Sequence, residues 1–270
     1  MPFWQIEYLK IGIVEISTWS FLTALALAVG LFLYFLALQK NKIKISEFNF
    51  LLKALGCVLA IFLGARLFNF LEGDWLVKNF WHWQLGGFSF WGGLMGGLLC
   101  GFVIWRFSAL KNYPFLKLFN LAAIPLTVAL LIGRSGCLLA QDHPGILTSL
   151  PWGIVWPNGE IRHPVVVYLL LSHLGLLAFL LLLKKLKAKT SCWSGLQKSP
   201  MAVFLLWVGV SRFLLDFTRI RNEIFSEKML AFLSWSQWMG ILAIFVGFWL
   251  LWRAKPMSLI KTNNNLKQDH

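Results

Sequence analysis

PVVVYLLLSHLGLLAFLLLL, residues 164–183, decides the fold class of this chain. The stretch contains no Asp, Glu, Lys or Arg, and it ends directly before Lys184 and Lys185. An α-helix needs about 20 apolar residues to cross the roughly 30 Å hydrocarbon layer of a bilayer. The stretch therefore predicts a transmembrane helix that stops at the lysines. Seven segments of this kind run over about 17–38, 50–71, 88–107, 118–140, 164–183, 200–218 and 233–252.

The composition points to a membrane protein. Hydrophobic residues make up 58% of the 270 residues, with 15 Trp and 24 Phe, so much of the surface must face lipid. We expect an all-α integral membrane protein with residues 1–255 as one domain and 256–270 as a cytoplasmic tail. The first segment has no basic region before it and is interpreted as a retained helix. The four cysteines show no CxxC spacing, and we expect no disulfide framework, metal site or cofactor.

The net charge of +14 is distributed unevenly over the connections. Four alternate connections, after the first, third, fifth and seventh segments, carry most of the basic residues: Lys40, Lys42, Lys44 and Lys53; Arg106, Lys111 and Lys117; Lys184, Lys185, Lys187, Lys189 and Lys198; Arg253, Lys255, Lys261 and Lys267. The positive-inside rule then places the N-terminus outside and the C-terminus in the cytoplasm. Because the charge follows topology, nucleic acid is not expected as a partner.

Three segments carry an arginine near their predicted outer end, namely Arg66, Arg134 and Arg212. A charge in a spanning helix is costly unless it is paired or hydrated, so it marks a candidate functional site. Arg212, Asp216 and Arg219 are spaced i, i+4 and i+7, which predicts one shared helical face. An internal ion pair that fastens helices together would explain Asp216. Arginines in excess over acids also suit a bound phosphate, such as a phospholipid headgroup.

Glycines gather at the start of the third segment. Small residues four apart usually mean close helix packing in membranes, which is the expected role of Gly96, Gly97 and Gly101. Gly92 and Gly93 lie at the predicted helix entrance, where they can instead allow close approach of the backbone to a ligand.

Short motifs occur in a fixed order along the chain: Gly64-Ala65-Arg66, GGFSFWGGLMGG from Gly86, GRSGCLLAQDHPG from Gly133, Pro151-Trp152-Gly153, Arg162-His163-Pro164 with Tyr168, SRFLLDFTR from Ser211, and Gln237. This ordered set resembles the prolipoprotein diacylglyceryl transferase family over essentially the whole chain. No single motif is decisive, whereas the set is highly specific.

The resemblance implies a multi-pass enzyme of the bacterial plasma (inner) membrane. Such enzymes transfer the diacylglyceryl group of phosphatidylglycerol to the lipobox cysteine thiol of secreted prolipoproteins, so the expected partners are phosphatidylglycerol, lipobox-containing prolipoproteins and membrane lipids. The residues that it assigns to catalysis are Arg134, Arg212, Asp216, Asp142 and His163. Those that it assigns to substrate binding are Arg66, Gly92, Gly93, Cys137, Gly145 and Arg219. Within this set, Arg134 and Arg212 are expected to hold the phosphate, and Asp216 to orient Arg212.

The chain departs from the family pattern at several of these positions. The departures are Ser20 for Tyr, Trp91 for His, Cys137 for Asn, Asp142 for Glu, Leu169 for Glu and Asp216 for Glu. Because Trp91 cannot take a proton, Asp142, His143 or His163 is expected to assist deprotonation of the thiol. The alternative is a noncatalytic lipid- or lipoprotein-binding homologue that has lost the base. A transporter is a more remote alternative, because the charges lie at one leaflet rather than along a path.

Three of the polar residues also have structural interpretations. His163, with Pro164 at the first turn, is expected mainly to cap the fifth helix. His173, in the middle of that helix, is interpreted as a packed, hydrogen-bonded residue. Cys137 is expected to be a small buried side chain rather than a reactive thiol.

Overall fold

The computed structural model describes residues 5–12, 14–72, 88–141, 144–185, 191–220, 229–230 and 232–254. Within these ranges, seven helical spans are long and apolar enough to cross a bilayer, as the sequence predicts. They are α1 (Thr18–Lys40), α2 (Glu47–Glu72), α4 (Phe90–Phe107), the pair α5 (Phe115–Leu121) and α6 (Ala123–Ala140), α7 (Val165–Lys185), α9 (Pro200–Leu215) and α10 (Trp235–Ala254). The predicted tail, residues 256–270, lies outside the described residues.

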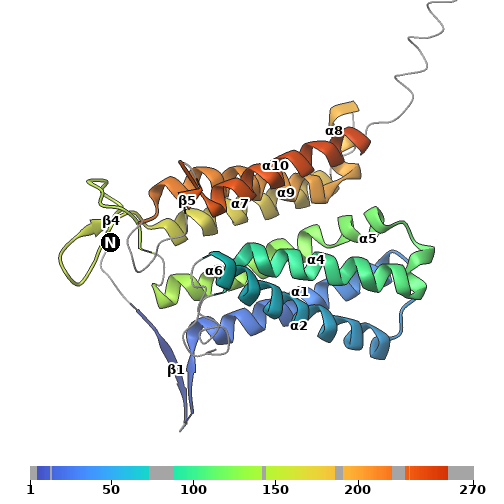
Figure 1. Cartoon of the computed structure of the whole chain (residues 1–270), viewed down its shortest axis with the longest axis horizontal. Coiled ribbons are helices and arrows are strands. Elements are labelled where there is room, and N and C mark those ends of the chain that lie inside the picture. The colour runs from blue at the N-terminus through green and yellow to red at the C-terminus, as the bar shows by residue number, and fades with distance from the viewer. Residues whose placement is uncertain are drawn as a thin grey trace, which may run out of the picture.

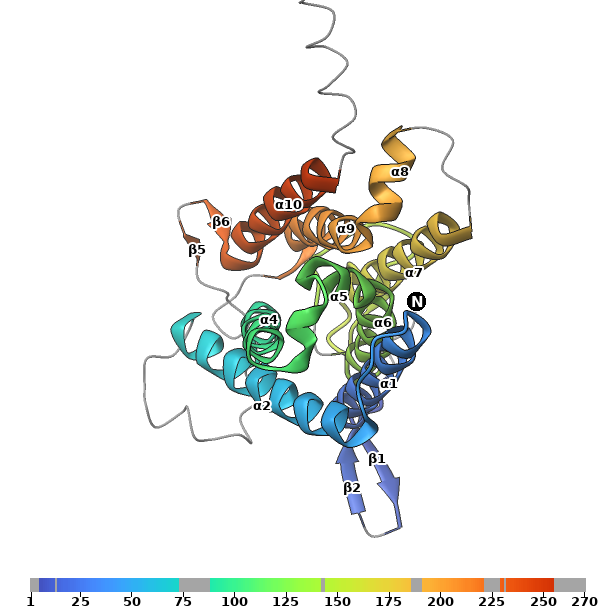
Figure 2. The ribbon, with the colours of Figure 1, turned by 90° about the vertical axis from the view of Figure 1, so that its right-hand side faces the viewer.

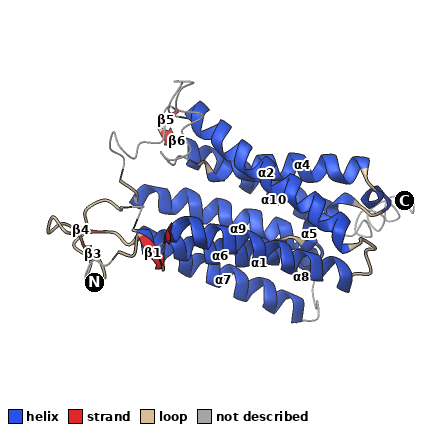
Figure 3. Ribbon diagram, turned by 90° about the horizontal axis from the view of Figure 1, so that it is seen from below, coloured by secondary structure: helices blue, strands red, loops and turns tan. Residues whose placement is uncertain are grey.

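Short elements connect these helices. The helical ones are η2 (Ala109–Asn112), α8 (Ser191–Lys198) and η3 (Asp216–Thr218). The strands form antiparallel pairs: β1 (Tyr8–Ile11) with β2 (Val14–Ser17), β3 (Ile154–Val155) with β4 (Ile161–Arg162), and β5 (Met229–Leu230) with β6 (Leu233–Ser234). All three pairs lie toward the same end of the bundle, here called the hairpin end (Figures 1 and 3). The opposite end is here called the basic end, because α1, α7 and α10 finish there with Lys40, Lys184, Lys185 and Arg253.

The fourth predicted span is divided at Ala122 rather than forming one continuous helix. Pro125 has no backbone N–H, so the carbonyl of Leu121 cannot receive the bond that would continue the helix. Helix α5 accordingly ends at Leu121, and Leu126 donates its N–H to the carbonyl of Ala122 at 2.9 Å as α6 begins. The proline thus sets the starting point of α6, the helix that carries Arg134.

Helix α6 lies near the centre of the bundle when the molecule is viewed along the helices (Figure 2). It packs against α1 on one side and against α7 and α9 on the other, while α2 pairs with α4 and α9 with α10. A buried apolar core joins α4, α6, α7, α9 and α10, and its members include Trp91, Ala123, Leu176, Phe204 and Ala243. Large apolar side chains also cover the outside, where Phe48 is 76% and Phe245 is 69% exposed. This outward apolar surface is the one expected of helices surrounded by lipid.

Glycines bring α2 and α4 into backbone contact, which confirms the packing interpretation for Gly96 and Gly97. A Cβ atom on Gly96 would overlap the carbonyl oxygen of Ala60, and one on Gly97 would lie 3.0 Å from the Ile61 side chain. The interpretation is wrong for Gly101, where an added Cβ would meet nothing within 4 Å. Close approach without large side chains maximises van der Waals contact, which replaces the hydrophobic effect between helices in lipid.

We therefore predict that Gly96→Leu destabilises the protein, whereas Gly101→Leu, on the same helix, does not. Forcing a side chain into packed backbone costs about 1–3 kcal/mol or more, while the second position has open space. Thermal unfolding of the two variants in detergent, compared with the wild type, measures the difference. Equal unfolding temperatures for the two variants would contradict this packing of α2 against α4.

Candidate functional site

Arg134 lies in α6, about 9 Å from the hairpin end of that helix at 1.5 Å per residue. Its side chain is half-buried, and its Nη1 lies 3.8 Å from the Sγ of Cys137, one turn further along. Cys137 is only 5% exposed, which confirms the prediction of a small buried side chain. The thiol thus helps to hold the guanidinium against the helix.

Arg212 lies near the hairpin end of α9 and is 8% exposed. Its Nη2 donates a hydrogen bond of 3.3 Å to the Oγ of Ser236, in the first turn of α10. The close approach of α9 to α10 makes this contact possible, since a Cβ on Gly209 would lie 2.7 Å from the carbonyl oxygen of Gly240. A buried cation is therefore fixed across two helices.

Asp216 is 3% exposed and connects the end of α9 to the start of α10. Its Oδ2 accepts a 2.6 Å hydrogen bond from the Oγ of Ser234, and its Oδ1 lies 3.4 Å from Nη1 of Arg219. The prediction that Arg212, Asp216 and Arg219 share one helical face is wrong. Helix α9 ends at Leu215, Asp216 opens the 3-10 turn, and Arg219 follows in extended conformation.

Ser234 and Gln237 form a capping box at the start of α10. The Gln237 N–H donates to the Oγ of Ser234 at 3.2 Å, and the Ser234 N–H donates to the Oε1 of Gln237 at 2.9 Å. This reciprocal pairing satisfies two helix N-terminal donors. It also fixes the Ser234 hydroxyl that binds Asp216, so the cap and the acid belong to one network. The pattern Ser-x-x-Gln before an apolar segment could have identified it in the sequence.

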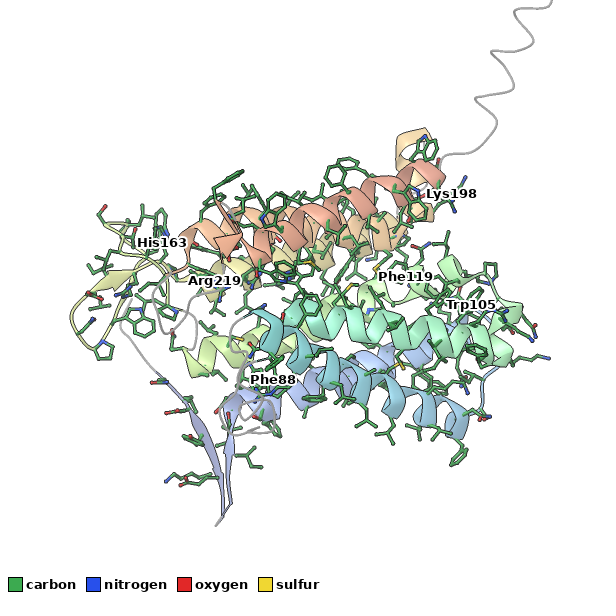
Figure 4. All side chains as sticks on the ribbon, viewed as in Figure 1. Phe88, Trp105, Phe119, His163, Lys198 and Arg219 are labelled. Carbon is green, nitrogen blue, oxygen red and sulfur yellow. The ribbon has the colours of Figure 1, made fainter. Side chains whose placement is uncertain are left out.

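The loop after α6 is held between two other segments. Ile146 donates its N–H to the carbonyl of Thr218 at 3.0 Å, and His163 donates its N–H to the carbonyl of Ile146 at 3.0 Å. Gly145 is paired with Arg219 as an isolated bridge, and its carbonyl accepts a 3.0 Å hydrogen bond from Nη1 of Arg162. This layer ties the ends of α6 and α9 to the β3–β4 hairpin at the hairpin end (Figure 4).

His163 lies in this layer rather than within the helices (Figure 4). Its Nδ1 is 3.2 Å from the hydroxyl of Tyr168, which also accepts a 2.9 Å hydrogen bond from the Nε1 of Trp152. The imidazole of His163 therefore contacts the Tyr168 side chain in the first turn of α7. The sequence had suggested that it caps a backbone N–H of this helix. Nearby, hydrogen bonds from Asn158 and from Arg162 hold the pKa of the Glu160 carboxyl below its usual value.

Arg66 is buried near the hairpin end of α2, at 4% exposure. Its guanidinium carbon lies 5.7 Å from the ring centroid of Phe88, a cation–π contact. The same segment is anchored by the Ser89 N–H, which donates to the carbonyl of Ala65 at 3.0 Å. Gly92 and Gly93, predicted to bind substrate, face α2: a Cβ on Gly92 would overlap Gly64 and Phe68. Helix packing accounts for both glycines, and their role in binding stays a prediction.

His173 is the one polar side chain on the buried face of α7, among Val165, Val166, Leu169, Leu176, Leu180 and Leu183. It is 3% exposed, which confirms that it is packed. Its Nδ1 has no partner at normal hydrogen-bond geometry among the described residues, although the carbonyl of Leu169, one turn earlier, acts on the ring as a hydrogen-bond acceptor. The expectation of a hydrogen-bonded ring therefore stays a prediction. The guanidinium groups of Arg134 and Arg212 both act electrostatically on its ring. These arginines lie on α6 and α9, two of the helices that pack against α7.

Trp91 is 3% exposed in the apolar core. Its Nε1 is buried without a hydrogen-bond partner among the described residues. Asp142 and His143, two other candidates for the thiol proton, lie outside the described residues. Sequence analysis had not assigned site roles to Ser234, Ser236 or His173. The spacing of His173, four residues after Leu169 and three before Leu176, could have indicated that it lies on the same buried helix face as these leucines.

A bundle of bilayer-length helices with cationic side chains converging near one end defines a multi-pass membrane protein. The chain belongs to the prolipoprotein diacylglyceryl transferase family, whose sequence profile matches residues 7–253.

The chain is similar to proteins named phosphatidylglycerol–prolipoprotein diacylglyceryl transferase from three bacteria. The Chlamydia trachomatis protein is 32% identical over 236 residues, covering 80% of each chain. The Legionella pneumophila protein is 26% identical over 224 residues, covering 80% of this chain and 81% of the relative. The Pseudomonas aeruginosa protein is 30% identical over 189 residues, covering 67% of this chain, which spans 64% of the length of that relative.

We predict that Asp216→Ala lowers the free energy of unfolding by about 3 kcal/mol. The variant removes the carboxylate and leaves its partners, Ser234 and Arg219, without their acceptor. The exposed ion pair between Lys10 and Glu15 provides a matched control, since its side chains are 75% and 56% exposed. Glu15→Ala should change stability by less than about 1 kcal/mol. Denaturant unfolding in detergent measures both, and similar effects of the two variants would argue against a structural role of Asp216.

Proposed function

We propose that this protein transfers the diacylglyceryl group of phosphatidylglycerol to the lipobox cysteine thiol of secreted prolipoproteins, at the outer leaflet of the bacterial plasma (inner) membrane. Family membership supports the reaction. The observation that carries the site is that Arg134 on α6 and Arg212 on α9 both act electrostatically on the buried His173 of α7, and that these three helices pack together. Two guanidinium groups that influence the same buried side chain suit a single bound phosphate.

In this proposal the arginines hold the lipid phosphate and stabilise it as it leaves. Guanidinium binds phosphate through parallel hydrogen bonds, and donors fixed in a low-dielectric site are most effective where charge develops. The thiolate sulfur attacks the glyceryl carbon that is bonded to the phosphate oxygen. A carbon–sulfur bond forms, the carbon–oxygen bond breaks, and glycerol phosphate leaves with the electron pair.

The other proposed site residues support this centre. Cys137 and Ser236 position Arg134 and Arg212 through the contacts described above. Asp216 fixes the end of α9 through Ser234 and Arg219, and so orients Arg212 only through the local backbone and its network. Gly145 holds the loop layer, while Arg66 and Arg219 add positive charge near the hairpin end for the anionic headgroup. Asp142 and His163, both in loops, are candidates for assisting the deprotonation of the client thiol.

The proposed orientation places the hairpin end outside and the basic end in the cytoplasm. The basic last turns of α1, α7 and α10 support it, because Lys and Arg concentrate on the cytoplasmic side of membrane proteins. The proposed site then faces the side on which secreted prolipoproteins present their thiol.

We predict that Arg134→Ala and Arg212→Ala each reduce lipid transfer at least about 100-fold, as expected for loss of a group that stabilises developing charge. Arg106→Ala, at the basic end, is the matched control and should retain activity. The assay is complementation of a bacterium depleted of its own transferase, with the mass of a reporter lipoprotein's N-terminal peptide as the readout. A diacylglyceryl increment must appear with the wild type and with Arg106→Ala.

Two outcomes would overturn parts of this proposal. No increment from well-expressed, membrane-inserted wild-type protein would instead indicate a noncatalytic lipid- or lipoprotein-binding homologue. Loss of membrane insertion in both arginine variants would show that the arginines stabilise the fold rather than bind phosphate.

The orientation gives a separate prediction. Tyr8 is 52% exposed in β1. A cysteine introduced there should react with a membrane-impermeant maleimide that reaches the outer face of the plasma membrane of intact cells. A cysteine at Asn41, in the turn between α1 and α2, should react only after the membrane is permeabilised. Labelling is measured in a background with the four native cysteines replaced, and the reverse pattern would invert the topology.

A further inference from the structure

We propose that His173 accepts the proton of the client thiol, so that a histidine on α7 provides the general base in this chain. The inference rests on the proposed function and deepens it. Proton transfer by a positioned histidine is the commonest form of general base catalysis, and it requires a ring nitrogen that is not already bonded. Three features of the structure point to His173.

The first feature is an unsatisfied buried ring. His173 is 3% exposed, and its Nδ1 has no partner at normal hydrogen-bond geometry among the described residues. The carbonyl of Leu169, one turn earlier, acts on the ring as a hydrogen-bond acceptor, and a neutral imidazole that directs its N–H at this carbonyl keeps its other nitrogen available to accept a proton. Buried polar atoms in native structures are almost always bonded, so one that is not bonded calls for an explanation. A ligand that contributes a thiol at this point would supply the missing partner.

The second feature is its position. The buried face of α7 is otherwise apolar, and it packs against α6 and α9, the helices that carry Arg134 and Arg212. At 1.5 Å per residue, His173 lies about 12 Å below the hairpin end of α7, and Arg134 about 9 Å below that end of α6. The base and the proposed phosphate ligands thus come from three helices in mutual contact, which lie beside one another in the view along the bundle (Figure 2).

The third feature is the surrounding charge. Arg134 on α6 and Arg212 on α9 both act on the His173 ring, while Lys184, Lys185 and, on α8, Lys198 lie at the basic end. A phosphatidylglycerol phosphate held by the two arginines would add a negative charge beside the imidazole. An anion favours the protonated ring. Lipid binding would therefore make His173 a better proton acceptor before the thiol reacts.

The other candidate bases are less well placed. The Nδ1 of His163 is already within hydrogen-bond distance of Tyr168, and this histidine belongs to the loop layer at the end of the bundle (Figure 4). Trp91 has an indole N–H, which donates and cannot accept a proton. His173 is the described histidine that combines burial, an unpartnered nitrogen and proximity to both arginines.

The proton balance of the reaction closes without another reactant. His173 takes the S–H proton, and the thiolate forms the carbon–sulfur bond as the carbon–oxygen bond to phosphate breaks. The phosphate oxygen keeps that electron pair and receives the proton from the imidazolium. The products are the diacylglyceryl thioether, glycerol phosphate and a neutral His173, ready for the next turnover.

The test compares His173→Gln with the wild type in nanodiscs that contain phosphatidylglycerol, using a synthetic lipobox peptide. We expect kcat to fall by about 10²–10⁴-fold near neutral pH while phosphatidylglycerol binding is unchanged. As the pH is raised from about 6 to about 10, the difference in kcat between the variant and the wild type should shrink. A thiol of pKa about 8.5 loses its proton to alkaline solution without help from a general base. A peptide with selenocysteine, which ionises at lower pH, should recover most of the rate at neutral pH.

Leu174→Ala, at the adjacent position where the side chain is 53% exposed, is the control and should behave as the wild type. If His173→Gln fails to fold, as judged by its thermal transition, His173→Asn is measured in its place. The inference is overturned by a wild-type rate in the variant, or by a loss that neither alkaline pH nor selenocysteine reduces. No transfer by the folded wild type would overturn the proposed function itself, and this inference with it.

Discussion

A charged side chain buried in a lipid-facing helical bundle is stabilised mainly by partners inside the protein. The helix backbone satisfies its own hydrogen bonds, so this requirement falls on the side chains. Arg212 meets it through Ser236, and Asp216 through Ser234 and Arg219. The contacts with Ser234 and Ser236 join the end of α9 to the start of α10. The contact with Arg219 joins it to the segment that follows α9. The need to stabilise a few charges thus determines how the helices meet at the hairpin end.

Small residues make these contacts possible. The close approach of α9 and α10 at Gly209 and Gly240 brings the Ser236 hydroxyl within reach of Arg212. The corresponding approach of α2 and α4 places Phe88 beside Arg66. In lipid, where apolar surfaces gain little by leaving their surroundings, such tight contacts are a main source of stability. The same packing that holds the bundle together therefore positions its arginines.

The proposed chemistry divides between the bundle and the loop layer. Rigid helices carry Arg134, His173 and Arg212, which suits groups that must hold fixed positions around a reacting phosphate and thiol. The loop layer, with Gly145 and Arg162, ties the exits of α6 and α9 together and lies where a client protein would approach. In this proposal the base comes from α7, and Trp91 packs in the apolar core.

The sequence alone determined the class, the seven spans and the family, because apolar length and the ordered motifs are local features of the chain. It also singled out Arg134 and Arg212, since charge is conspicuous in apolar segments. Only the tertiary structure decided the partners: Asp216 binds Ser234 of β6, Gly101 faces open space while Gly96 packs, and His163 belongs to a surface layer. It also brought His173 of α7 within electrostatic range of Arg134 and Arg212. These facts depend on which helix faces meet, and that is set by packing between segments far apart in the chain.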